Sequence, residues 1–200
     1  MDIPAKVILS NGELAMACNT NVILTKRAII ESASMLFNSN IDIVTHTFKD
    51  IIAGDKKLTA SVPKISKGES YNGFPYVLMD YPALFGKENI FGVRTMFWWG
   101  NFFRITLHLK GSYKNKYAPI ILKNLQLEND VYLAVGDKEW EHQFEGNNFA
   151  IFAAISNVQK QRIAEKNFLK IALKYELHHW NMMQSILPIG YKKIASLLKP

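Results

Sequence analysis

The sequence has few of the features that would place it outside an ordinary globular class. Its single cysteine, Cys18, excludes an intrachain disulfide and a thiolate metal cage built from this chain alone, which fits a reducing compartment. Its longest unbroken apolar run, residues 149–155, is seven residues long, whereas a membrane-spanning helix needs about 20. Residues 1–6 lack the basic and apolar regions of a secretory signal. We therefore expect a soluble, cytoplasmic protein without a membrane partner.

Motifs of catalysis and cofactor binding are also missing. The chain contains no Gly-x-Ser-x-Gly, no Gly-x-Gly-x-x-Gly, no Walker loop and no His-Glu-x-x-His. Cys18 lies in an apolar run, where a packed thiol is expected. Glu139, Glu141 and His142 could hold a divalent ion loosely, but an exposed acidic loop is the simpler interpretation. We therefore predict neither a metal nor a cofactor.

Charge is distributed unevenly along the chain. The net charge is +7 and the pI is about 9.4, which favours anionic partners. Residues 104–123 contain five basic residues and no acid, whereas residues 128–145 contain six acids and a single base, Lys138. No repeat, low-complexity tract or Pro/Gly/Ser-rich linker divides the chain. We expect one domain over residues 1–200.

The first third of the chain has the apolar spacing of helices. Thr25 is placed to cap a helix whose apolar face includes Ile29 and Phe37, and residues 41–52 repeat the 3.6-residue spacing up to Gly54. Residues 10–13 fit both a capping box and an Asn-Gly hairpin turn, and we favour the helix. Two or three helices are therefore expected before residue 55.

The middle of the chain is rich in β-forming residues. Residues 74–81 form an apolar and aromatic run that Pro82 should stop. Residues 90–99 and 102–110 form two further runs, separated by Gly100 and Asn101, which predicts a hairpin. Pro119 suits the first turn of a short helix that ends near Leu127.

The last third should contribute two strands and further helices. Residues 149–155 are apolar throughout, which predicts a central strand covered on both faces. Ser156 and Gln159 form a capping-box pattern for a helix to about Lys166, and residues 169–178 alternate as a half-buried strand with a basic outer face. If the two strands are neighbours, the connection is a right-handed crossover. A short helix should end at Pro188 and a final amphipathic helix should follow.

Together these elements predict an α+β fold. We expect an antiparallel or mixed sheet of about five to seven strands, centred on the hairpin at residues 90–110. The N-terminal and C-terminal helices should pack on this sheet.

The hairpin predicts a face of mixed aromatic and basic character. Gly and Asn both tolerate positive φ, so a two-residue loop is expected, which places Trp98 opposite Phe103. The side away from Trp98 would suit a small anionic or amphipathic ligand, and its candidate binding residues are Phe97, Trp99, Arg104, Thr106 and His108. The first hypothesis is therefore a non-catalytic binding module. The structural alternative is a solvent face on which Arg104 stacks on Phe97.

Two other functions remain as alternatives. Lys110, Tyr113, Lys114 and Lys116 combine cations with aromatic rings in the basic stretch, which could bind nucleic acid or another anionic partner. Without a docking motif, such binding to nucleic acid would be weak, independent of sequence and sensitive to salt. An enzyme would use an acid/base site assembled from distant residues, with Asp80, His108 and Arg104 as candidates. For Asp80 we favour a structural ion pair with Arg94 or Arg104.

Overall fold

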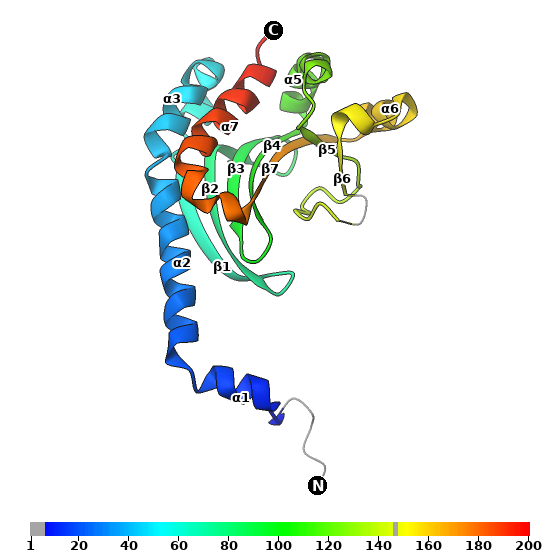
Figure 1. The fold of residues 1–200 in the computed structure, drawn as a ribbon. Helices are drawn as coiled ribbons and strands as arrows, with labels where there is room; N and C mark the ends of the chain where they lie inside the picture. Colours follow the sequence, from blue (N-terminus) through cyan, green and yellow to red (C-terminus); the bar gives the residue numbers. More distant parts are fainter. Residues whose placement is uncertain (1–6, 146–147) are drawn as a thin grey trace.

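The computed structural model describes residues 7–145 and 148–200, and it has the expected α+β architecture. A curved sheet of seven strands forms the centre, and every neighbouring pair of strands is antiparallel. Helices from both ends of the chain cover one face of this sheet (Figure 1). The predicted fold class is confirmed.

The strands run in the order β1-β2-β3-β4-β7-β5-β6 across the sheet. Because β7 inserts between β4 and β5, the last long strand of the chain lies beside the central hairpin. The bounds are β1 (Lys64–Tyr71), β2 (Phe74–Phe85), β3 (Ile90–Trp98), β4 (Phe102–Lys110), β5 (Tyr132–Ala134), β6 (Phe149–Ile151) and β7 (Phe168–Glu176).

Seven α-helices and three short 3₁₀ helices complete the described part of the chain. Both predicted capping boxes are present, at Ser10 with Glu13 and at Ser156 with Gln159. No helix among the described residues is long and apolar enough to cross a membrane. The bounds are α1 (Asn11–Ala17), α2 (Thr20–Asn38), α3 (Ile41–Ile52), α4 (Lys56–Thr59), α5 (Ser112–Asn124), η2 (Leu125–Leu127), η3 (Phe152–Ala154), α6 (Asn157–Glu165), η4 (Leu177–Met182) and α7 (Met183–Leu197).

Three predicted boundaries at proline are wrong: the helix start at Pro119 and the ends at Pro82 and Pro188. Pro119 and Pro188 lie inside α5 and α7, where the buried side chains of each helix offset the hydrogen bond that proline removes. Strand β2 continues through Pro82 because its register with β3 shifts between Asp80 and Ala83. Pro82 therefore has no partner in β3 and is not required to donate a backbone hydrogen bond there.

The predicted central strand at residues 149–155 is also wrong. Only Phe149–Ile151 is extended; it pairs with β5 alone, at the edge of the sheet, and a 3₁₀ turn follows. No parallel crossover to β7 exists, since β7 pairs with β4 and β5. An apolar run of this length predicts burial but does not distinguish a strand from a turn packed on the core.

The N-terminal helices extend beyond the sheet (Figure 1). Helix α2 begins at Thr20 and is capped by Asn19, so Thr25 lies within the helix rather than at its start. Helix α1 has no buried residue, and Cys18 is exposed, so the expected packed thiol is not found. The first partly buried side chains of α2 that pack against the core are Ile29 and Ile30, and the first fully buried one is Ala33.

The hairpin between β3 and β4 has a different register from the one predicted. Trp98 pairs with Phe102 and Phe97 pairs with Phe103, so the loop contains three residues and not two. Gly100 adopts the positive φ (71°) in the middle of this loop, and the backbone N–H of Asn101 donates to the Trp98 oxygen at 3.0 Å. Because side chains alternate along a strand, a shift of one residue moves all of β4 to the opposite face relative to β3.

The two faces of the sheet consequently differ in chemistry. Phe97, Phe103 and Ile105 belong to the apolar core beneath the helices. On this side, Thr95 is hydrogen-bonded to the buried hydroxyl of Tyr191 in α7 at 2.9 Å. The opposite face carries the even-numbered residues of β3 and β4, among them Arg104.

We predict that Gly111→Ala destabilises the protein by about 2–3 kcal/mol. Gly111 joins β4 to α5 with φ 61° and ψ −133°, which is a region open mainly to glycine, and an added Cβ would lie 2.3 Å from the backbone oxygen of Glu88. Gly54→Ala is the matched control, because its Cβ would meet no atom within 4 Å, and it should change stability by less than about 0.5 kcal/mol. Urea unfolding of the two variants measures both values; equal losses would contradict the prediction.

Candidate functional site

A set of basic side chains lies on the sheet face that the helices leave uncovered. Period-two alternation directs every second residue of β3, β4 and β7 to this face. Cross-strand neighbours bring these residues together, since Arg104 is opposite Lys174 and His108 is opposite Lys170. We refer to this set as the cationic face; its members are Arg94, Arg104, His108, Lys110, Lys170 and Lys174.

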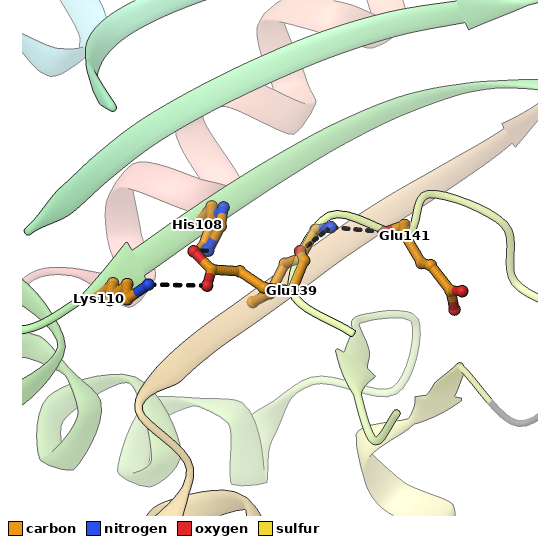
Figure 2. A network of polar contacts seen from close by, with 5 residues as sticks. His108, Lys110, Glu139 and Glu141 are labelled. Carbon is orange, nitrogen blue, oxygen red and sulfur yellow. Dashed lines mark hydrogen bonds and ion pairs between the residues drawn. The ribbon is translucent and has the colours of Figure 1, made fainter. Parts of the chain in front are cut away.

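An irregular segment buries much of the cationic face. Residues 137–144, which we call the covering segment, follow β5 and lie over β4 and β7, and Figure 2 shows Glu139 of this segment beside His108 and Lys110. Beneath it Arg104 is 0% exposed, Lys170 2% and His108 4%. Basic residues are almost never buried to this extent unless they are paired. The partners of each one therefore decide what the site can bind.

The positive charge of Arg94 is paired with a carboxylate. Its Nε and Nη2 atoms donate to the two carboxylate oxygens of Asp80 at 2.7 and 2.9 Å, in a bidentate ion pair. The structural pairing expected for Asp80 is confirmed, with Arg94 as its partner. Asp80 is therefore held as a counterion to Arg94.

Arg104 is fully buried without a carboxylate partner among the described residues. Its Nη1 donates to the backbone oxygen of His142 at 2.7 Å, and its Nη2 contacts Nδ1 of the same residue. The guanidinium lies 5.7 Å from the ring centre of Phe149, and its Nε makes no hydrogen bond to any residue that the structure describes. Burial lowers the pKa of Arg104 to about 9. This is a buried cation whose charge is only partly compensated.

Lys170 is bound to backbone oxygens in place of a carboxylate. Its Nζ donates to the carbonyls of Glu139 and Glu141 at 3.0 and 2.6 Å, and lies 5.6 Å from the ring centre of Phe149. Burial, and then the positive charge of Arg104, lower the pKa of Lys170 to about 6. The ammonium form is therefore disfavoured at neutral pH.

Glu139 connects the covering segment to β4. Its Oε2 accepts a hydrogen bond from Lys110 at 2.9 Å, and its Oε1 lies 3.3 Å from His108 Nε2 (Figure 2). Burial lowers the pKa of His108 to about 3, so the imidazole is neutral at pH 7 and this second contact is no ion pair. Among the residues that the structure describes, Thr106 Oγ1 has no hydrogen-bond partner, and Glu139 Oε1 and His108 Nε2 have none besides this long contact with each other. The site thus holds several buried polar atoms that an additional group could satisfy.

The structure separates the predicted ligand-binding residues into two groups. Arg104, Thr106 and His108 lie together on the cationic face, whereas Phe97 faces the helices and contacts Phe103 and Trp180. Trp99 lies in the hairpin loop and packs against Phe97. The predicted grouping of these five residues is wrong, because it assumed the two-residue loop.

Other residues of the site were missed from the sequence. Lys170 and Lys174 were recognised only as the outer face of a half-buried strand, and Lys170 is in fact buried. Tyr71 was not singled out, although its hydroxyl accepts a hydrogen bond from the backbone N–H of His142 at 2.7 Å. Basic residues at alternate positions of this strand, among them Lys170 and Lys174, were the available sequence signal. Nothing in the neighbouring sequence indicated that another segment would bury them.

The residues proposed for nucleic-acid binding lie on two consecutive elements, β4 and α5. Lys110 belongs to the cationic face and pairs with Glu139, whereas the other three lie in α5, which is a helix and not the expected loop. The Tyr113 hydroxyl donates to Asp55 at 2.5 Å, and the Lys114 ammonium donates to the backbone oxygen of Ala164 at 2.6 Å. Lys116 lies over the ring of Tyr117. Tyr113 and Lys114 are thus engaged within the chain, whereas Lys116 is exposed, and nucleic-acid binding by these residues stays a prediction.

A cavity of about 240 Å³ opens at the hairpin end of the cationic face. Its wall combines aromatic rings with the ammonium of Lys174, and its lining residues are Trp98, Gly100, Asn101, Phe102, Gln143, Phe144, Glu145 and Lys174. A larger cavity of about 460 Å³ lies between β6 and α6, where Arg162 and Lys166 both line the wall and the Lys166 ammonium is bound by the oxygens of Val135 and Gly136. No cluster of potential metal ligands is found among the described residues. Both cavities lie near Arg104, the smaller one through its strand partner Lys174 and the larger one through Phe149, whose ring the guanidinium faces.

We predict that Lys170→Met weakens the pH dependence of stability. Between about pH 6 and 10 the unfolded chain carries a proton on Lys170 that the folded chain lacks, so the free energy of unfolding should rise with pH. One such group adds up to about 1.4 kcal/mol per pH unit. Urea unfolding at pH 7, 8 and 9 should show a smaller slope in Lys170→Met than in the parent. Lys174→Met is the control, since Lys174 is partly exposed and pairs with Glu176; a parent-like slope in Lys170→Met would contradict the prediction.

Comparisons of the chain with models of protein families, with curated proteins and with solved structures find no match. The function proposed below therefore rests on the side chains of the cationic face and the cavity beside it.

Proposed function

We propose that this protein binds a small amphipathic anion at the hairpin end of the cationic face. The anionic group would be held by Lys174 and Arg104, and the apolar body would lie among Trp98, Phe102 and Phe144. The observation that carries the proposal is the buried guanidinium of Arg104, which has an unpartnered Nε and no carboxylate partner among the described residues. An anion bound here would supply the missing counterion.

The two cations are placed to act on one group. Arg104 and Lys174 are paired across β4 and β7, and side chains at such positions start about 4.5–5.5 Å apart. The planar guanidinium matches the geometry of a carboxylate or phosphate, whereas the ammonium acts as a point charge. Lys174 is 27% exposed and lines the cavity, and an anion bound there would replace the half-exposed Glu176 carboxylate that lies 2.9 Å from its ammonium.

The cavity favours a ligand that also has an apolar body. The ring centres of Trp98 and Phe102 are 5.3 Å apart, and those of Phe102 and Phe144 are 5.1 Å apart, both edge-on. Lys174 lies 5.5 Å from the ring centre of Phe102. Ligand sites typically combine apolar walls with a few polar groups that fix orientation. An alkyl or aryl carboxylate or phosphate has this combination.

We predict that Arg104→Met and Lys174→Met each weaken the binding of octyl phosphate by about 10- to 100-fold, the loss expected for a charged hydrogen bond. Lys116→Met is the control, because it removes one positive charge from α5 and should leave the affinity unchanged. Calorimetric titration with octyl phosphate, octanoate and inorganic phosphate measures the head-group and body contributions separately. Thermal unfolding checks that each variant is folded.

The same titrations can overturn the proposed binding site. If octyl phosphate binds neither the parent nor any variant described here, or binds Arg104→Met and Lys174→Met as it binds the parent, the cationic face is not the ligand site. If octanol binds as tightly as octyl phosphate, the cavity is an apolar site and the cations have no role in binding.

A further inference from the structure

The covering segment is attached to the sheet by side chains and not by a strand ladder. Within residues 137–144 the structure has one hydrogen bond between backbone groups, from the Glu141 N–H to the Lys138 oxygen at 3.4 Å, and it lies inside the segment. The flanking residues Val135 and Gly136 bond to Asn148, not to the central strands. The segment can therefore leave the sheet without breaking any strand pairing, which is typical of regions that open locally.

Most polar contacts between the sheet and the segment come from the cationic face, beside the Tyr71 hydroxyl and the aromatic contacts of Trp140 and Phe144. Arg104 binds the oxygen of His142, Lys170 binds the oxygens of Glu139 and Glu141, and Lys110 binds the carboxylate of Glu139. In each contact, a basic side chain of the sheet donates a hydrogen bond to an oxygen atom of the segment. The segment thus presents oxygens to the cationic face as a bound anion would.

The fit of the segment to the cationic face is incomplete. Arg104 Nε and Thr106 Oγ1 are buried under it without a hydrogen-bond partner in the described part of the chain, and His108 Nε2 lies 3.3 Å from Glu139 Oε1 of the segment without a well-formed hydrogen bond. A buried unsatisfied polar atom typically costs about 1–3 kcal/mol. Only one carboxylate of the segment, that of Glu139, contacts the cationic face, whereas Asp137 and Glu141 pair with Lys166 and Lys138 elsewhere. A compact oxyanion could satisfy Arg104 more fully than a neutral carbonyl does.

We infer that the covering segment is an internal occupant of the anion site, and that a ligand carrying a carboxylate or phosphate group binds by displacing it from Arg104. This inference rests on the proposed function and adds how the buried guanidinium becomes accessible. The ligand enters at the cavity beside Lys174, which Gln143 and Phe144 of the segment also line. Its head group then takes the place of the His142 oxygen on Arg104.

Two variants that loosen the segment test the inference, and they leave Arg104, Lys170 and Lys174 unchanged. Tyr71→Phe removes a hydroxyl that accepts from the His142 N–H and donates to Gln143, both at 2.7 Å, without changing any charge at neutral pH. Glu139→Gln removes the carboxylate that pairs with Lys110. Glu69→Gln on β1 is the charge-matched control for the second variant, because Glu69 is exposed and pairs with Lys26 instead.

We predict that Tyr71→Phe binds octyl phosphate about 3- to 10-fold more tightly than the parent, and that Glu139→Gln binds it about 10-fold more tightly. Glu69→Gln should bind like the parent. Hydrogen exchange of the amides of residues 137–144 should become faster when octyl phosphate is added, because the ligand releases the segment. Most ligands slow exchange at their site, so the sign of the change is diagnostic.

The outcomes separate this inference from the proposed function. If Arg104→Met weakens binding but Tyr71→Phe and Glu139→Gln bind like the parent or more weakly, the anion site stands and the internal-occupant inference is overturned. Slower exchange in residues 137–144 on ligand addition would overturn it as well, because the segment would then close over the ligand. Binding to Tyr71→Phe but not to the parent would support both, and binding to no variant would overturn both.

Discussion

The register of the β3–β4 hairpin is the constraint on which the rest of the structure depends. Three residues between the strands place Phe97 opposite Phe103, so their rings enter the helix-covered core. The same register directs Arg104 to the other face. A loop one residue shorter would move the β4 cations into the apolar core beneath α2 and α7, where no counterion is placed for them.

The two faces of the sheet are stabilised in different ways. The helix-covered face is a continuous apolar core, whose burial supplies the main driving force for folding. The other face holds Arg104 and Lys170 against backbone oxygens of a segment that has no regular secondary structure. Buried cations with incomplete partners contribute little to stability, and such groups are commonly kept for function. The cationic face has this character, whereas the core beneath the helices does not.

Burial also alters the protonation chemistry of the cationic face. The pKa values of Arg104, His108 and Lys170 are all lowered, in each case chiefly because water is excluded. Their positive charges disfavour one another in addition. In the proposed complex, a bound anion would favour the charged form of Lys170, so ligand binding and proton uptake would be linked through this one side chain.

Local features of the sequence determined which elements form, and tertiary structure decided how they are used. The capping boxes at Ser10 and Ser156, the helix over residues 41–52 and the two strands of the hairpin could be predicted, because caps and side-chain periodicity act over a few residues. So could the ion pair of Asp80, since a lone carboxylate in an apolar strand needs a nearby counterion. Three features could not be predicted from the sequence: the hairpin register, the continuation of helices through Pro119 and Pro188, and the burial of Arg104 and Lys170. Each depends on what packs against it, and for the cationic face this is a segment more than 25 residues away in sequence, whose carbonyl oxygens carry no sequence signal at all.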